Sequence, residues 1–233
     1  MQEIDFQDLL FEAWDKFRAN WKKLCMASFL GFFLPFFVYF CYLIYFVFDM
    51  QGNLNNHQQP DFASMIILFV IVGVFLIMAM IFSVGTENYT MKICRGETPE
   101  TKDFFLPFKT YLRLMAAGFL IVLAINIGIL LCVIPGLILM FFLAFTTYAI
   151  IDHPELGVIE CMKHSWRLIK KNWKPTLILF VINYAISSVI GGTIIGLIPY
   201  EPFSILLCSL LYTKFNDEAA VESQPQPQLT STF

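Results

Sequence analysis

Long runs without a charged residue alternate with short charged segments along this chain. The uncharged runs cover 25–48, 62–86, 114–151 and 175–200, and the last continues after Glu201 to 213. A helix needs about 20 apolar residues to cross the hydrocarbon core of a bilayer. Each of the first two runs therefore predicts one membrane-spanning helix.

The two later runs are long enough to cross twice, and each contains residues that favour a turn. Pro135-Gly136 lies inside the third run, and Gly191-Gly192 and Gly196 lie inside the fourth, with Pro199 and Pro202 shortly after. The pattern predicts an all-α integral membrane protein with six transmembrane helices in three hairpins. The expected spans are about 25–48, 62–86, 114–134, 137–151, 176–193 and 198–213.

Composition and the placement of charge support this fold. Hydrophobic residues make up 58 % of the chain and charged residues 14 %, whereas soluble proteins carry about a quarter charged residues. The predicted outer connections (49–61, the Pro135-Gly136 turn and 191–201) contain no Lys or Arg, and all 15 basic residues lie elsewhere. Because basic residues collect in short cytoplasmic loops, we expect both termini and the segments 87–113 and 152–175 to be cytoplasmic.

All four tryptophans belong to two copies of the pattern Trp-x5-Asn-Trp-Lys, which start at Trp14 and Trp166, 152 residues apart. Apolar positions recur around each copy at steps of three and four, which predicts amphipathic helices before the first and third hairpins. The first copy belongs to the amphipathic helix predicted over 1–24. Its apolar positions are Phe6, Leu10, Trp14, Phe17, Trp21 and Leu24. The second copy repeats them at Val158, Met162, Trp166, Ile169 and Trp173.

Each copy ends in basic residues next to the following span, where Trp and Lys favour the headgroup layer. One interpretation is that these helices only anchor the bundle to the inner leaflet. The other is that their cations recognise anionic lipid headgroups. The candidate lipid or interface contacts are Trp14, Trp21, Lys22, Lys23, Trp166, Lys170, Lys171, Trp173 and Lys174.

Little in the chain points to catalysis, so we expect no enzymatic activity, no cofactor and no metal. The six cysteines are scattered singly and are typical of packing residues. Glu160 and His164 are four residues apart and share a helix face. One interpretation is a metal or acid–base pair. The other is that both belong to the solvated face of a helix that starts near Asp152 and His153. The spans carry no charged residue at mid-depth, which argues against ion-coupled carriers.

A series of short motifs gives the chain a family resemblance. The series is Ile134-Pro135-Gly136, Asp152, Glu160, Ser165, Lys170-Lys171-Asn172-Trp173, Pro199-Tyr200 and Tyr212. It resembles the uncharacterised bacterial membrane-protein families related to the membrane domain found beside some glycerophosphodiester phosphodiesterases. The resemblance implies a bacterial inner-membrane domain of six helices without an assigned reaction.

Three functions from different classes remain open on the sequence. The first is a non-enzymatic membrane protein that binds, organises or moves lipid-like molecules, anionic lipids included. The second is a membrane subunit or scaffold whose cytoplasmic amphipathic helices dock a protein partner or a second copy. The third is an enzyme that acts on a membrane-embedded substrate through Glu160 or His164. No nucleic-acid partner is expected, and the polar segment 216–233 predicts a disordered tail.

Overall fold

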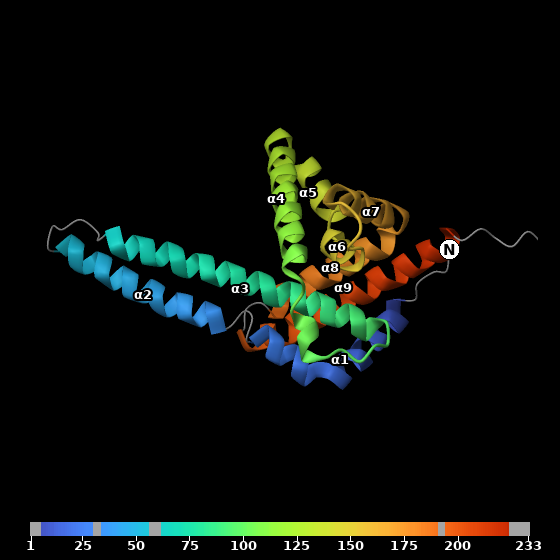
Figure 1. The fold of residues 1–233 in the computed structure, drawn as a ribbon, viewed down its shortest axis with the longest axis horizontal. Helices are drawn as coiled ribbons and strands as arrows, with labels where there is room; N and C mark the ends of the chain where they lie inside the picture. The colour runs from blue at the N-terminus through green and yellow to red at the C-terminus, as the bar shows by residue number, and fades with distance from the viewer. Residues whose placement is uncertain (1–5, 30–33, 56–61, 191–193, 224–233) are drawn as a thin grey trace, which may run out of the picture.

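The computed structural model describes residues 6–29, 34–55, 62–190 and 194–223, and every regular element among them is helical (Figure 1). The α-helices are α1 (Phe6–Ser28), α2 (Leu34–Asn55), α3 (Phe62–Cys94), α4 (Phe108–Leu131), α5 (Val133–Phe142), α6 (Thr146–Asp152), α7 (Val158–Lys171), α8 (Trp173–Ile190) and α9 (Ile194–Ser223). A short 3-10 helix, η2 (Thr101–Phe104), lies between α3 and α4. The prediction of an all-helical chain is confirmed.

Three helical stretches have the length and apolar composition of membrane spans. They are Met65–Cys94, Thr101–Leu131 and Val133–Asp152. Two shorter helical stretches, Phe36–Phe48 and Trp173–Val189, are also apolar. These stretches indicate a membrane protein.

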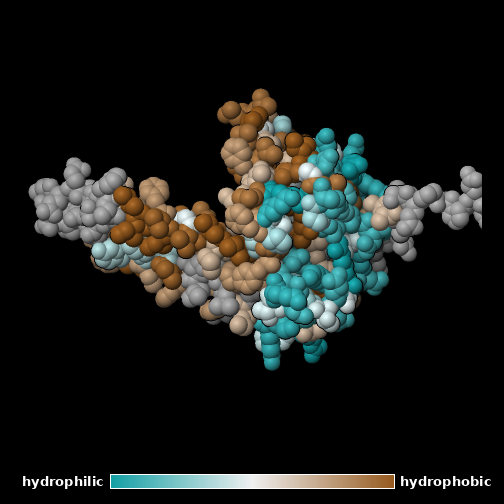
Figure 2. Space-filling view, viewed as in Figure 1, coloured by the Kyte–Doolittle hydropathy of each residue, from teal (hydrophilic) through white to brown (hydrophobic). Residues whose placement is uncertain are grey.

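The apolar helices project away from a packed region. In Figure 1, α2 and α3 run side by side to the left, and α4 rises at the top with α5 beside it. Their apolar side chains are largely uncovered: Phe48 is 70 % exposed, Phe69 74 % and Leu130 88 %. Figure 2 accordingly shows the hydrophobic colour over these helices and the hydrophilic colour over the other side of the molecule. Such surfaces require an apolar environment.

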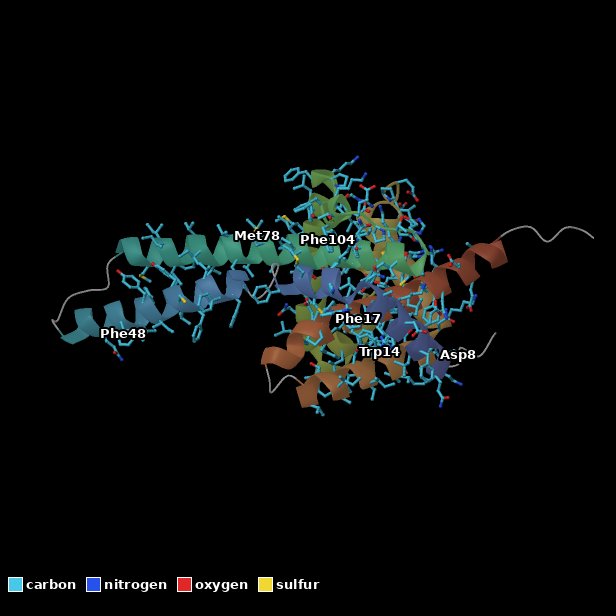
Figure 3. All side chains as sticks on the ribbon, turned by 90° about the horizontal axis from the view of Figure 1, so that it is seen from below. Asp8, Trp14, Phe17, Phe48, Met78 and Phe104 are labelled. Atoms are coloured by element: carbon cyan, nitrogen blue, oxygen red, sulfur yellow. The ribbon has the colours of Figure 1, made fainter. Side chains whose placement is uncertain are left out.

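The buried core lies where the other elements meet, in a region that we call the packed base. The packed base comprises α1, the end of α3 from Val84, η2, the start of α4 as far as Ala117, α6, α7, α8 around Leu179 and the part of α9 from Leu206 to Phe215. Tyr148 of α6 stacks on Tyr212 of α9 with ring centroids 5.6 Å apart. Figure 3 shows Trp14, Phe17 and Phe104 in this region, and Phe48 and Met78 outside it.

A close approach of η2 to α3 shapes one side of the packed base. Gly96, with φ of 77°, ends α3 and turns the chain back. The ring of Phe104 then stacks on Tyr89 with centroids 4.4 Å apart. A methyl group on Gly85 would lie 2.3 Å from the Phe104 carbonyl oxygen, so only glycine allows η2 to lie this close.

The helix boundaries differ from those expected for the first span, 25–48. α1 runs through the predicted boundary at residue 24 to Ser28, and α2 begins only at Leu34 and continues to Asn55. Leu24 is buried, as its place on the apolar stripe predicted, and Cys25 packs against the same cluster, so the contacts of α1 with the packed base continue past residue 24.

The second hairpin does not turn at Pro135-Gly136, as the sequence predicted. The turn is at Cys132, which has extended φ and ψ of −171° and 147°, and the dipeptide lies inside α5. Pro135 is the third residue of α5, and the first four N–H groups of a helix have no partner within it. Proline therefore costs this helix no hydrogen bond.

The following limb, predicted as one span over 137–151, is two helices. α5 ends at Phe142 and α6 starts at Thr146. The Ser165 hydroxyl donates to the Phe142 carbonyl oxygen at 2.9 Å and accepts from the Phe145 N–H at 3.1 Å. A single side chain of α7 thus satisfies the backbone on both sides of this break.

The last helix is longer than predicted at both ends. α9 begins at Ile194, before Gly196, Pro199 and Pro202, and continues to Ser223. The prediction of disorder from residue 216 is wrong as far as Ser223, because α9 continues through these residues, where Asn216 donates to Asp152 at 3.1 Å and Ala219 packs against the core. Residues 224–233, like Gly191-Gly192 and residues 56–61 of the predicted outer loop, lie outside the described residues.

Candidate functional site

The two copies of the tryptophan pattern bury equivalent positions. The buried residues of the first copy are Leu9, Ala13, Phe17 and Leu24. Their counterparts 152 residues later, Cys161, Ser165, Ile169 and Thr176, are buried too, and the second copy also buries Leu168, whose counterpart is the partly exposed Lys16. The sequence repeat is therefore also a repeat of burial. The predicted apolar stripe was partly wrong, however, because Trp14 and Trp21 lie beside the buried face rather than on it.

The asparagine of each copy makes the same hydrogen bond. The Asn20 side-chain amide donates to the Lys16 carbonyl oxygen at 3.1 Å, and Asn172 donates to that of Leu168 at 3.4 Å. The backbones differ at this point, since α1 continues past Asn20 whereas α7 ends and α8 begins at Asn172. The repeat thus keeps its side-chain contacts across a change in helix geometry.

The second tryptophan and the lysine after it are also equivalent in the two copies. The Lys22 ammonium lies 5.9 Å from the centre of the Trp21 ring, and Lys174 lies 5.9 Å from that of Trp173. Both tryptophans are 49 % exposed. Each pair is a cation held over an exposed aromatic face, a contact that contributes about 0.5–1 kcal/mol at such sites.

We call Trp14, Trp21, Lys22 and Lys23 the first Trp–Lys segment, and Trp166, Lys170, Lys171, Trp173 and Lys174 the second. The first tryptophan of each segment takes part in packing. Trp14, 52 % exposed, meets Phe203 of α9 edge-on with centroids 6.1 Å apart. Trp166 is more covered and stacks on Phe142 at 4.3 Å. Trp166 is thus held in the contact between α5 and α7.

The lysines of both segments are exposed, but they do not all face the same way. Lys23 is nine residues, or about two and a half helical turns, beyond Trp14, so it lies on the opposite side of α1. There it lines a groove of about 440 Å³ with Asp15, Asn20 and Glu97. In the first segment, therefore, the tryptophans are accompanied by Lys22 rather than by Lys23.

A buried aspartate joins three helices at the edge of the packed base. Asp152 ends α6, and its side chain is only 7 % exposed. It forms an ion pair with Arg95 at the end of α3. From α9 it accepts hydrogen bonds from the Asn216 amide at 3.1 Å and from the Tyr212 hydroxyl at 3.3 Å. We call these four residues the Asp152 cluster.

The sequence drew attention to Asp152 and Tyr212 only through the family resemblance, and it missed Arg95 and Asn216. The available signal was that Asp152 directly follows a long uncharged run and that Arg95 lies nine residues after the end of another. Asn216, the first residue of the segment predicted as a disordered tail, gave no such signal. Pairing these residues required the helix arrangement.

His164 borders the Asp152 cluster. Its Nε2 atom lies 3.1 Å from the Asn216 amide oxygen, and its ring centre lies 5.3 Å from that of His153. Burial, together with the nearby His153, lowers the pKa of His164 below its ordinary value. At neutral pH this imidazole is therefore uncharged.

The Glu160–His164 pair considered from the sequence does not form. The Glu160 carboxylate instead accepts a hydrogen bond from the Gly157 N–H at 2.8 Å, in the first turn of α7. The expected helix start is real, but Gly157 rather than Asp152 or His153 precedes the helix. Among the described residues, no group of three or more His, Cys, Asp or Glu side chains is arranged to hold a metal ion.

Comparison with known proteins places the chain in a family by sequence alone. No solved structure matches it. The sequence match covers residues 65–232, which include the second Trp–Lys segment and the Asp152 cluster and leave out the first Trp–Lys segment. Because this match spans well over half of the chain, the protein belongs to the family defined by the domain of unknown function DUF7847.

Proposed function

We propose that this protein is a non-enzymatic membrane protein of the bacterial inner membrane that binds lipid headgroups through its two Trp–Lys segments, with a preference for anionic lipids. It would thereby organise or move lipid-like molecules at the cytoplasmic leaflet. Both termini and both segments would lie on the cytoplasmic side.

The proposal rests on the matched pairs Trp21–Lys22 and Trp173–Lys174. In each pair a half-exposed indole stands beside an exposed ammonium group, next to apolar helices with uncovered side chains. An indole favours the boundary between headgroups and acyl chains, and an ammonium group favours the phosphate. Two copies of this combination support a membrane-surface role.

Charge selectivity follows from the number of cations. Lys170 and Lys171 extend the second segment beside Lys174, and each lysine near an anionic surface contributes about 1 kcal/mol. Zwitterionic lipids offer no comparable net attraction. We therefore expect tighter binding of phosphatidylglycerol than of phosphatidylcholine.

The finer architecture is part of the same proposal. We assign the hairpins to α2 with α3, α4 with α5 and α6, and α8 with the first half of α9, which gives six membrane spans when α5 and α6 together count as one. α2 and α8 carry apolar stretches shorter than the usual span, and each is followed by a long helix. Kinship with the membrane domains beside glycerophosphodiester phosphodiesterases is proposed on the sequence resemblance, without their enzymatic activity.

Lipid titration of the purified full chain in mild detergent, followed by native mass spectrometry, tests the proposal. In the test variant Lys170, Lys171 and Lys174 are each replaced by Gln. We expect its affinity for phosphatidylglycerol to fall at least roughly tenfold, with little change for phosphatidylcholine.

A matched control separates specific contact from net charge. It replaces Lys102, Lys109 and Lys163 by Gln, which removes three exposed cations outside both Trp–Lys segments. Equal losses in the two variants, or no loss in the test variant, would refute the lipid role. Unchanged lipid binding together with loss of a co-purifying protein would favour the scaffold function instead.

A further inference from the structure

A polar groove lies between α1 and the turn that follows α3. Its volume is about 440 Å³, and α1 packs against the end of α3 beside it (Figure 1). Ligand sites in proteins commonly measure about 300–1,000 Å³, so the groove can hold a small molecule. α1 contributes Asp15, Ala19 and Lys23 to its lining, and the turn contributes Glu97 and Thr98.

The two walls of the groove are joined through Lys16. Its ammonium group donates to the carbonyl oxygens of Ile93 and Cys94 at the end of α3, each at 3.4 Å. The turn itself is closed by a hydrogen bond from the Gly96 N–H to the Ile93 carbonyl oxygen at 3.1 Å. The backbone around the groove is therefore organised without a ligand, which lowers the cost of binding one.

Three charged side chains of the groove have no hydrogen bond or ion pair with any other described residue. They are Asp15, Lys23 and Glu97, and all three are exposed. The charge of Lys16, in contrast, is opposed by Glu12 at 3.6 Å. The groove thus offers two carboxylates that lack a cation and one ammonium group that lacks an anion.

The opposite charges on α1 stand at the two ends of one row. Asp15, Ala19 and Lys23 are four residues apart, so they follow one face of the helix. Asp15 and Lys23 are separated by about 12 Å along the helix axis, at 1.5 Å per residue. The short side chain of Ala19 leaves room between them. A long lysine side chain and a small ligand can together bridge this distance.

Under the proposed function, the groove opens at the membrane surface. Lys23 belongs to the first Trp–Lys segment and directly follows Lys22, which lies over the Trp21 ring. About one turn farther along α1, the side chain of Met26 is 63 % exposed. A ligand in the groove would therefore lie beside the headgroup layer, where tryptophan is favoured.

We propose that this groove binds an aminoethyl phosphate group, the headgroup chemistry of phosphatidylethanolamine. The inference rests on the proposed function, because it takes the first Trp–Lys segment to lie at the membrane surface. The primary ammonium group of the ligand donates to Asp15 and Glu97, and Lys23 donates to its phosphate. The two carboxylates repel a purely anionic headgroup, and the trimethylammonium group of phosphatidylcholine has no N–H to donate.

Native mass spectrometry of the purified full chain in mild detergent tests the groove. Three lipids with the same acyl chains are titrated: phosphatidylethanolamine, its N,N-dimethyl derivative and phosphatidylcholine. We expect the affinity to fall in this order, with phosphatidylethanolamine bound at least roughly tenfold more tightly than phosphatidylcholine. Replacing Asp15 by Asn and Glu97 by Gln together should abolish this preference. The thermal midpoint of this variant should be unchanged, because both side chains are exposed.

The matched control replaces Asp8 by Asn and Glu155 by Gln, which removes two exposed carboxylates outside the groove. It should keep the full preference for phosphatidylethanolamine. The variant of Lys170, Lys171 and Lys174 should keep this preference as well. A failure of anionic-lipid binding is thereby distinguished from a failure of the groove.

Equal affinities of the unaltered chain for phosphatidylethanolamine and phosphatidylcholine would overturn the proposal. An equal loss of the preference in both double variants would overturn it too. Glycerophosphoethanolamine, added as a water-soluble competitor, identifies the source of the ligand. Displacement of the lipid only by a large excess supports a membrane lipid, whereas displacement at equal concentration supports a soluble aminoethyl phosphate in the same groove.

Discussion

The backbones of Gly128 and Gly136 are in direct contact where α4 packs against α5. A methyl group on Gly128 would lie 2.9 Å from the Gly136 Cα atom. A methyl group on Gly136 would lie 2.4 Å from Ile129 Cγ1 and 3.0 Å from the Ile129 nitrogen. The second hairpin therefore depends on two glycines for its close packing, as small residues allow in membrane helix pairs.

Replacing Gly136 by Ala should force the two helices apart. Overpacking of this kind costs about 1–3 kcal/mol, so we expect Gly136→Ala to lower the free energy of unfolding by that amount in detergent micelles. Gly118→Ala is the control, because a methyl group on Gly118 would have no neighbour within 4 Å. Equal stability of the two variants would contradict the close contact.

Asp152→Asn should weaken the junction of α3, α6 and α9. The substitution removes the charge that pairs with Arg95 and weakens the hydrogen bonds from Asn216 and Tyr212. We expect a loss of about 1.5–3 kcal/mol in equilibrium unfolding. Glu100→Gln breaks an exposed pair with Lys102 and should cost less than about 1 kcal/mol. A similar effect of both substitutions would show that the Asp152 cluster contributes no more than a surface pair.

The sequence predicted helices, apolar segments and the repeat because these depend on local composition and spacing. The counterpart contacts of Asn20 and Asn172, and of Trp21 and Trp173, follow the 152-residue offset. Helix ends were predicted less well, because Pro135-Gly136 has two uses. The dipeptide Pro-Gly is typical of a turn. It also occurs inside a helix when the proline lies in the first turn and the glycine allows a close helix contact, as Pro135 and Gly136 do here.

Contacts between distant helices could not be predicted from spacing alone. The predicted stripe of α1 contains Phe17 and Leu24, which are buried, and Trp14 and Trp21, which are half-exposed. It leaves out Leu9 and Ala13, which are buried in the core that α1 shares with α9. Leucine and tryptophan both count as apolar in the pattern, and only the shape of the partner helix decides which is buried. The Asp152 cluster likewise joins Arg95 to Asn216 across most of the chain.

His164 should make the packed base sensitive to acid. Its pKa is lowered in the folded protein, so the unfolded chain takes up this proton more readily, and stability falls as the pH drops below about 6.5. His153 and Arg167 disfavour protonation of His164, whereas Asp152 favours it. Burial and the two disfavouring groups outweigh Asp152, so the pKa of His164 is lowered. We expect His164→Gln to reduce the fall in unfolding midpoint between pH 7.5 and pH 5, measured by tryptophan fluorescence. An unchanged fall would assign the acid response to other groups.

Ser165→Ala tests the helix break between α5 and α6. The equivalent position of the first repeat is Ala13, which serves no such break in α1. In α7 the hydroxyl links the partly buried Phe142 carbonyl oxygen and the buried Phe145 N–H, and alanine would leave both groups without this partner. We expect a loss of about 1–3 kcal/mol in equilibrium unfolding. Ser188→Ala removes an exposed hydroxyl bonded to its own helix and should have almost no effect. If both substitutions change the free energy of unfolding equally little, other backbone groups or water must supply the hydrogen bonds to the Phe142 carbonyl and the Phe145 N–H. Ser165 would then contribute only packing.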